Sequence, residues 1–203
     1  MDDSTFVQRL LVGAAVLGGL AVRDLRRNGS RARLWRELSF IAATAAGAIV
    51  YAIGHDLVTC SICPEYFSVG KGIAAAARGF GSEVAWLATR AGWSVGVFIG
   101  LVLVVANNPS ARGRPQLSHR SLGRFLAFPV AGALSFSIAL GVASVLLAQR
   151  LVRASGLDLL WLVDPEGFVV VWAIHLGSYA GVVVGSAVAA GLVHAERRSI
   201  RKP

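Results

Sequence analysis

The chain has few charged residues for its length, and this excludes an ordinary water-soluble domain. Lysine, arginine, aspartate and glutamate make up 15% of its 203 residues, whereas soluble domains contain about 25%. Hydrophobic residues make up 55%, and the mean hydropathy is +0.64. Long apolar runs of this kind are typical of membrane-spanning helices. The composition therefore predicts an all-α integral membrane protein.

Several functional signatures are also missing. Two cysteines are too few for a disulfide framework, and one chain with two cysteines cannot form a four-cysteine zinc site. The sequence contains neither H-E-x-x-H nor H-x-x-E-H, which are spacings of zinc enzymes. It also lacks the G-x-x-x-x-G-K-[ST] loop that binds nucleotide phosphates. No internal repeat suggests the two-fold design of a transporter. Motifs therefore indicate no enzyme class.

The basic residues are concentrated between the apolar runs. Residues 23–37 contain six arginines, and residues 107–124 contain four, whereas residues 56–84 contain only one arginine and one lysine. This alternation explains the net charge of +9 by the positive-inside rule rather than by nucleic-acid binding. We therefore expect a bacterial inner-membrane protein with no nucleic-acid partner. Its C-terminus is expected in the cytoplasm and residues 56–84 on the outer side.

Five apolar segments predict four core transmembrane helices and a fifth helix at the N-terminus. A span requires about 20 apolar residues. The first segment is shorter, contains Arg9 and ends in a basic cluster, which favours a short uncleaved span over a signal peptide. An interfacial or re-entrant helix is the alternative. The predicted chain comprises an N-terminal helix with a basic loop (1–37), a four-helix membrane core (38–198) and a basic tail (199–203). The five segments comprise residues 5–22, 38–55, 85–106, 125–149 and 167–194.

The start of the last helix is predicted from three consecutive residues. Asp164 suits the N-cap position, Pro165 the first helical position, and Glu166 the positive end of the helix dipole. The last span is therefore expected to begin on the outer side of the membrane, just before the fifth apolar segment.

Ionisable residues gather at the predicted outer ends of two spans. The stretch HDLVTCSICPEYF, residues 55–67, follows the second apolar segment and begins with a histidine and an aspartate. In the last segment, His175 lies roughly 12 Å from the outer helix end, and Tyr179 follows on the same helix face. Ionisable side chains inside a membrane indicate a functional site by default. We therefore expect His55 and His175 to meet in the outer half of the bundle.

Histidines and carboxylates in one cluster suit a transition metal such as Zn or Fe. The predicted metal ligands are His55, Glu65 and His175, with Asp56 as a fourth ligand or as a hydrogen-bond partner of the ligands. The same groups can instead relay protons, or form ion pairs and hydrogen bonds with no ligand. The wider candidate polar cluster comprises His55, Asp56, Glu65, Arg90, His175, Ser178 and Tyr179.

The structural interpretation of this cluster predicts a non-enzymatic accessory or structural protein of the inner membrane. A membrane metalloprotein or oxidoreductase that uses the cluster is the first alternative, and a small-solute or proton conductor is the second. Cys60 and Cys63 have the C-x-x-C spacing but lack the βαβ context of a thioredoxin-like motif. They can form a local disulfide or remain two packed thiols.

Small residues recur at every fourth position along the last apolar segment. In a lipid bilayer, such a stripe lets two helix backbones approach closely. We expect it to pack against another helix of the same chain. Formation of a homo-oligomer or of a larger membrane complex through this stripe is the alternative. The residues of the stripe are Ala173, Gly177, Gly181, Gly185 and Ala189.

The stretch HDLVTCSICPEYF, together with the later WAIHLGSYAG, resembles a family of small bacterial multi-pass membrane proteins without an assigned activity. That family has an H-D-x-x-T-x-x-x-C-P-E-Y-F loop and a late H-x-x-S-Y helix motif. The resemblance covers residues 38–198 and implies four core spans, but no activity. Cys60 lies outside the family pattern, which weakens the disulfide interpretation. The matching positions are His55, Asp56, Thr59, Cys63, Pro64, Glu65, Tyr66, Phe67, His175, Ser178 and Tyr179.

Overall fold

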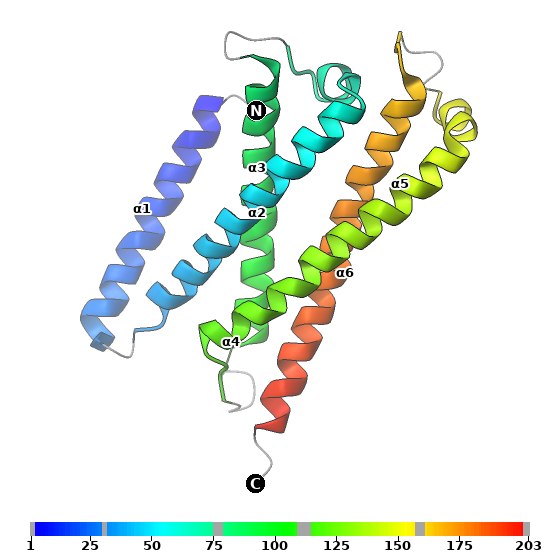
Figure 1. Cartoon of the computed structure of the whole chain (residues 1–203). Coiled ribbons are helices and arrows are strands. Elements are labelled where there is room, and N and C mark those ends of the chain that lie inside the picture. The colour runs from blue at the N-terminus through cyan, green and yellow to red at the C-terminus, as the bar shows by residue number, and fades with distance from the viewer. Residues whose placement is uncertain (1–2, 30–31, 75–78, 109–114, 157–160, 201–203) are drawn as a thin grey trace.

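The protein is a bundle of long helices joined by short connections, as the computed structural model in Figure 1 shows. In the part of the chain that the structure describes, five helices are long and apolar enough to cross a membrane. They confirm the all-α membrane bundle, including the fifth helix at the N-terminus. The five helices are α1 (Asp3–Asn28), α2 (Leu34–Ile62), α3 (Phe80–Ala106), α5 (Ala127–Ser155) and α6 (Pro165–Ser199). The described residues are 3–29, 32–74, 79–108, 115–156 and 161–200.

The helices are longer than the apolar segments because their polar ends are also helical. The helix α2 begins at Leu34, so the predicted boundary between residues 37 and 38 falls inside it. At its other end, α2 continues to Ile62, so the stretch expected as a loop is helical over its first eight residues. The helix ends before Pro64, where Cys63 has the extended conformation usual for a residue that precedes proline.

Short helical segments lie at both ends of the bundle. A π-helical turn, Tyr66–Gly70, follows α2. At the opposite end, α4 (His119–Gly123) and a 3-10 turn, Arg124–Leu126, lead directly into α5. The predicted start of α6 is confirmed, because the Asp164 side chain accepts a hydrogen bond of 2.8 Å from the Gly167 amide and Pro165 is the first helical residue.

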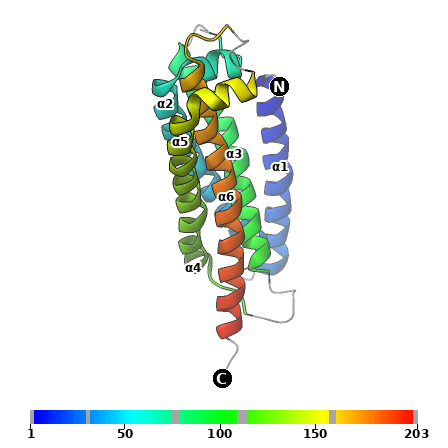
Figure 2. The same ribbon diagram turned by 90° about the vertical axis from the view of Figure 1, so that its right-hand side faces the viewer.

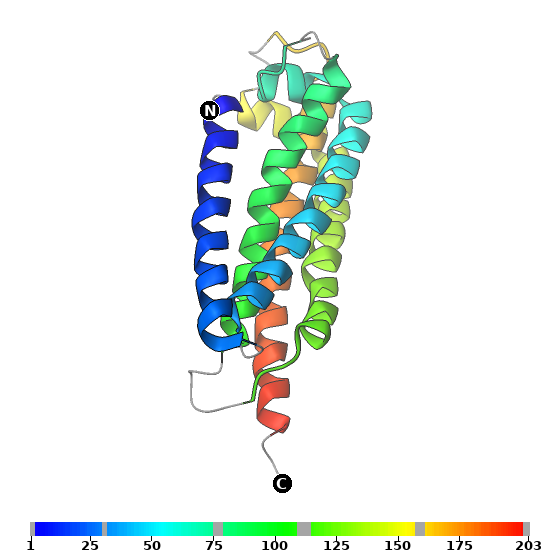
Figure 3. The ribbon, with the colours of Figure 1, turned by 90° about the vertical axis from the view of Figure 1, so that its left-hand side faces the viewer.

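The four core helices form two antiparallel hairpins. The helix α2 packs along α3, and α5 packs along α6, while the two hairpins meet mainly through α3 and α6. Figure 2 shows α5 and α6 side by side, and Figure 3 shows α2 beside α3. The helix α1 lies outside both hairpins, against α2, and its apolar side chains are largely exposed. These exposed side chains fit a surface that faces lipid.

Glycines set the spacing within each hairpin. On α6, a Cβ atom added to Gly181 would overlap the carbonyl oxygen of Gly132 on α5, and the neighbouring glycines of the stripe meet the α5 backbone in the same way. The stripe therefore packs inside the chain. A second stripe, which the sequence analysis missed, holds α3 against the α2 backbone. Its members are Gly92, Gly96 and Gly100.

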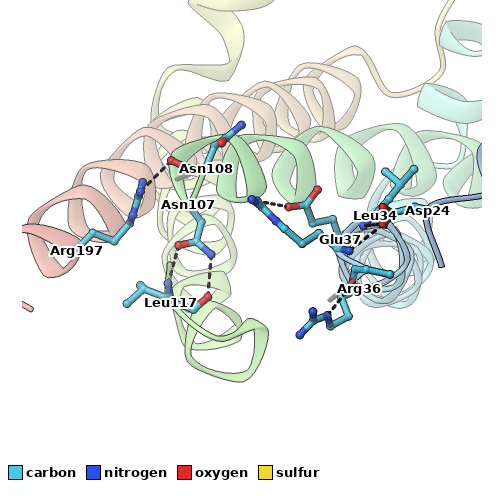
Figure 4. Close-up of polar contacts among 10 residues, drawn as sticks. Asp24, Leu34, Arg36, Glu37, Asn107, Asn108, Leu117 and Arg197 are labelled. Atoms are coloured by element: carbon cyan, nitrogen blue, oxygen red, sulfur yellow. Dashed lines mark hydrogen bonds and ion pairs between the residues drawn. The ribbon is translucent and has the colours of Figure 1, made fainter. Parts of the chain in front are cut away.

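Buried polar contacts close the end of the bundle that holds the C-terminus. The guanidinium of Arg197 is 1% exposed and donates to the carbonyl oxygens of Ala106, Asn108 and Pro115. Beside it, the Asn107 side chain both accepts from and donates to the Leu117 backbone at 2.9 Å. Figure 4 shows the contact of Arg197 with Asn108 and the contacts between Asn107 and Leu117. They fix the position of α3 relative to the end of α6.

The connection between α1 and α2 is also held at this end. The carboxylate of Asp24 accepts hydrogen bonds of 2.9 Å from the backbone amides of Arg33 and Leu34, which lack partners within the helix. Arg33 in turn forms an ion pair with Glu37 at 2.8 Å. Three basic clusters, namely residues 23–37, residues 107–124 and the C-terminal residues 197–202, have their described arginines at this same end of the bundle. The other members of the clusters lie outside the described residues, namely Arg31, Arg112, Arg114, Arg201 and Lys202.

Candidate functional site

Two histidines and an aspartate meet in the bundle near the end opposite the C-terminus. The Asp56 carboxylate oxygen Oδ1 lies 3.0 Å from Nδ1 of His55 and 3.2 Å from Nε2 of His175. One possible ligand atom from each residue lies within 4.8 Å of the others. Asp56 is 8% exposed and His175 is 4% exposed. The three residues, called the His–Asp cluster below, thus form a compact group between α2 and α6, in which Asp56 and His175 are buried and His55 is half-buried.

The backbone orients His175. Its Nδ1 lies 2.9 Å from the carbonyl oxygen of Val171, one turn earlier on α6. Because a carbonyl can only accept, Nδ1 of His175 carries a proton and donates it. The other nitrogen, Nε2, lies against Asp56. It donates a hydrogen bond to this carboxylate only when it is protonated as well, and without that proton its lone pair can bind a metal ion.

The segment after α2 covers the His–Asp cluster. The rings of Tyr66 and Phe67 are buried, and their centroids lie 4.7 and 5.8 Å from that of His175. Phe168 from the first turn of α6 contacts the Tyr66 ring at 5.4 Å. Burial, followed by the negative charge of Asp56, raises the pKa of Tyr66 to about 12. These aromatic rings cover one side of His175, which is 4% exposed.

Glu65 does not join the cluster, which differs from the sequence expectation. Its carboxylate accepts hydrogen bonds of 2.8 and 2.7 Å from the backbone amides of Val163 and Asp164. These amides lie directly before α6, so the hydrogen bonds of Glu65 connect the segment after α2 to the start of α6. The carboxylate near the histidines is instead that of Asp56, for which the sequence predicts the role of a fourth ligand or a hydrogen-bond partner.

The other predicted residues lie at varying distances from the cluster. Ser178 is buried, Tyr179 is 45% exposed, and both line a cavity beside the cluster. Arg90, on α3, is half-buried and is not among the described residues that line this cavity. The two cysteines are free thiols rather than a disulfide. Burial raises the pKa of Cys63, and its thiol lies 3.9 Å from the Asp164 carbonyl oxygen.

The cavity extends from the cluster toward the middle of the bundle. Its volume is about 210 Å³, and α2, α3, α5 and α6 all contribute to its wall. Along α2 it reaches from Asp56 to Thr44, roughly 18 Å. Sequence reasoning missed Tyr51, whose ring stacks on His55 with centroids 5.7 Å apart and which also lines the cavity. The signal that could have found it is the spacing of four residues to His55.

Comparison of the chain with protein families, curated proteins and solved structures yields no match. The function must therefore be argued from the site.

Proposed function

We propose that the protein is a multi-pass inner-membrane protein that binds a transition metal, Zn or Fe, through His55, Asp56 and His175. The observation that carries this proposal is the position of Asp56 Oδ1 at 3.0 and 3.2 Å from one nitrogen of each histidine. Two histidines and one carboxylate form a common ligand set for Zn and for non-haem Fe(II).

The distances fit a metal ion with little movement. A tetrahedral ion with ligand bonds of about 2.0–2.2 Å separates its donor atoms by roughly 3.4 Å. The three donor atoms already lie within 4.8 Å of one another. Small rotations of the side chains would place them at ligand distance. The Nδ1–H of His175 bonded to Val171 supplies the backbone hydrogen bond that ligand histidines usually make.

The surroundings favour a site with an open coordination position. Three protein ligands leave at least one position vacant, as in catalytic zinc sites. The cavity of about 210 Å³ adjoins all three residues. A further ligand could therefore reach the ion from the cavity, while the rings of Tyr66 and Phe67 close the other side.

Metal content tests this proposal directly. The protein is purified in detergent, and bound Zn and Fe are measured by mass spectrometry in the parent and in the His55→Ala/His175→Ala variant. We expect one ion per parent chain and its loss from the variant. Asp56→Asn, which keeps the shape of the side chain but removes its charge, is expected to weaken binding by about 10-fold or more.

The two remaining histidines provide a matched control. The chain has four histidines, and among the described residues neither His119 nor His194 belongs to a group of possible metal ligands. The His119→Ala/His194→Ala variant should therefore retain the metal. A parent without stoichiometric metal after reconstitution with Zn and Fe(II) would contradict the proposal, and would leave the cluster as a structural hydrogen-bonded group. Equal loss of metal from both double variants would contradict it as well.

In the proposed orientation, the His–Asp cluster lies in the outer half of the bilayer. The positive-inside pattern of the sequence supports this orientation. Ser61 and Ser199 lie exposed at opposite ends of the bundle. In a chain with both native cysteines replaced by serine, Ser61→Cys should react with an impermeant thiol reagent on intact cells, and Ser199→Cys only after permeabilisation. Labelling of both from the same side would refute the topology.

A further inference from the structure

The cavity beside the His–Asp cluster contains polar atoms that the proposed metal does not use. Tyr51 Oη and one nitrogen of His55, Nε2, are buried and have no hydrogen-bond partner within the described part of the chain. Both residues line the cavity and lie one turn apart on α2, with their rings stacked. Buried polar atoms are nearly always hydrogen-bonded. Two such atoms in one cavity wall are available to bond a polar group that enters the cavity.

The size of the cavity limits this ligand. An engineered cavity of about 150 Å³ lined by apolar residues holds one benzene ring, and the cavity here measures about 210 Å³. It therefore has room for one substituted six-membered ring. Apart from its polar end, its wall is apolar and includes Val95, Ile99 and Val182. A flat apolar ring with a few polar substituents matches a cavity that is polar at one end and apolar elsewhere.

Without a metal ion, the charge of the cavity disfavours an anionic headgroup. No lysine or arginine is present among the described residues of its wall, whereas the carboxylate of Asp56 is. A fatty-acid carboxylate or a lipid phosphate would meet a like charge with no basic partner. The Tyr51 hydroxyl and His55 Nε2, left unpartnered by the described residues, fit a neutral headgroup with hydrogen-bonding oxygens.

The cavity opens through the side of the bundle. Gly47 on α2 and Val130 on α5 both line it and are both exposed, Val130 by 46%. Gly47 lies near the middle of its helix, so this opening is at the depth of the lipid hydrocarbon. A long apolar tail attached to the ring can leave the cavity there and lie between the lipid chains.

From these observations we propose that the cavity binds a membrane quinone, a neutral ring with carbonyl oxygens and an apolar tail. The Tyr51 hydroxyl donates a hydrogen bond to one ring oxygen. The Nε2 atom of His55 donates to a quinone oxygen or accepts from a quinol hydroxyl, according to which nitrogen of the imidazole carries the proton. The tail passes between α2 and α5. This inference goes beyond the proposed function and does not require the metal.

Binding of decylubiquinone to the protein in lipid nanodiscs tests the inference. We expect saturable binding by the parent, both with metal and after treatment with a chelator. Tyr51→Phe, which removes one hydrogen bond, should weaken binding about fivefold. Val130→Phe, which narrows the side opening, should weaken it more than about 10-fold. Neither variant alters a proposed metal ligand, so both should keep the metal content of the parent.

Matched controls separate specific binding from partition into lipid. Val142→Phe enlarges another exposed valine of α5 that does not line the cavity, and it should bind decylubiquinone like the parent. Decylbenzene has the same tail and a ring without oxygens, and it should bind at least about 10-fold more weakly. Absence of saturable quinone binding, equal binding of decylbenzene, or tighter binding of decanoate would each overturn the proposal. A parent that holds no stoichiometric metal after reconstitution but binds decylubiquinone would overturn only the metal proposal.

Discussion

The backbone amide of Asp164 donates a hydrogen bond of 2.7 Å to the carboxylate of Glu65, which lies 99 residues earlier in the chain. Together with the Val163 amide, which donates to the other oxygen of the same carboxylate, this contact joins the end of α2 to the start of α6. It lies directly beyond the aromatic cover of His175. The Glu65 carboxylate therefore adds a polar contact to the hydrophobic cluster of Tyr66, Phe67 and Phe168 at this end of the bundle.

Replacement of this carboxylate should loosen the end of the bundle near the His–Asp cluster. We expect Glu65→Ala to lower the free energy of unfolding by about 1–2 kcal/mol, because two backbone amides lose a charged acceptor. In a Cys60→Ser background, the buried thiol of Cys63 should also react faster with a thiol reagent. Thermal unfolding and timed alkylation measure the two effects. Glu166→Ala, which removes an exposed carboxylate in the first turn of α6, should leave the alkylation rate unchanged.

The raised pKa of Tyr66 predicts that the folded protein loses stability at alkaline pH. Because burial raises its pKa from 10.0 to about 12, the folded state holds the phenolic proton more tightly than the unfolded state. The contribution of Tyr66 to the free energy of unfolding is therefore complete below pH 10.0 and is lost as the pH rises toward about 12. Unfolding of the parent and of Tyr66→Phe, measured side by side from about pH 9 to about pH 12, should show a steeper loss for the parent. Parallel curves would contradict this prediction.

Replacing a glycine of α6 by alanine should change the free energy of unfolding differently at Gly181, which lies in the glycine stripe, and at Gly191, which lies outside it. Gly181→Ala places a methyl group against the Gly132 carbonyl of α5, and we expect a loss of about 2 kcal/mol from the overpacked contact. Gly191 has open space around its Cα, so Gly191→Ala should be neutral or should stabilise α6 by up to about 1 kcal/mol. Titration with a denaturing detergent, followed by circular dichroism, compares them. Equal effects of the two substitutions would refute close packing at Gly181.

Replacement of Arg197, far from the His–Asp cluster, should lower the free energy of unfolding strongly. Its guanidinium is buried and satisfies three carbonyl oxygens at and beyond the end of α3. We expect Arg197→Met to lower the free energy of unfolding by about 3 kcal/mol or more, because these carbonyls lose charged donors. Arg198→Met removes an exposed arginine from the same helical turn and should cost less than about 0.5 kcal/mol. The same detergent titration measures both variants.

The parts of the structure that could be predicted from the sequence depend on local or one-dimensional signals. The Asp164-Pro165 start of α6 is specified by neighbouring residues, so its position follows from the sequence alone. The meeting of His55 and His175 follows from their similar depth in two spans. The partner of Glu65 could not be found, because a proline separates this carboxylate from α2 and the direction of the chain beyond it depends on tertiary packing.

The missed features have physical reasons as well. Tyr51 lies within a continuous apolar run, where an aromatic residue resembles ordinary core. The stripe formed by Gly92, Gly96 and Gly100 has the same spacing as the α6 stripe, but large residues surround it, so its period is less visible. Arg197 resembles one more residue of a solvated basic tail, because its burial depends on a connection between α3 and α5 whose path the sequence does not specify.

The division of the bundle into two hairpins has a consequence for biogenesis. His55 and Asp56 enter the membrane with the first hairpin, while His175 arrives later, with α6. Until then, the Asp56 carboxylate lies in the bilayer with one histidine and without its second partner. Insertion of α6 thus completes the polar centre. A chain truncated before α6 would present an incompletely paired carboxylate to the lipid, where an unpaired charge is costly.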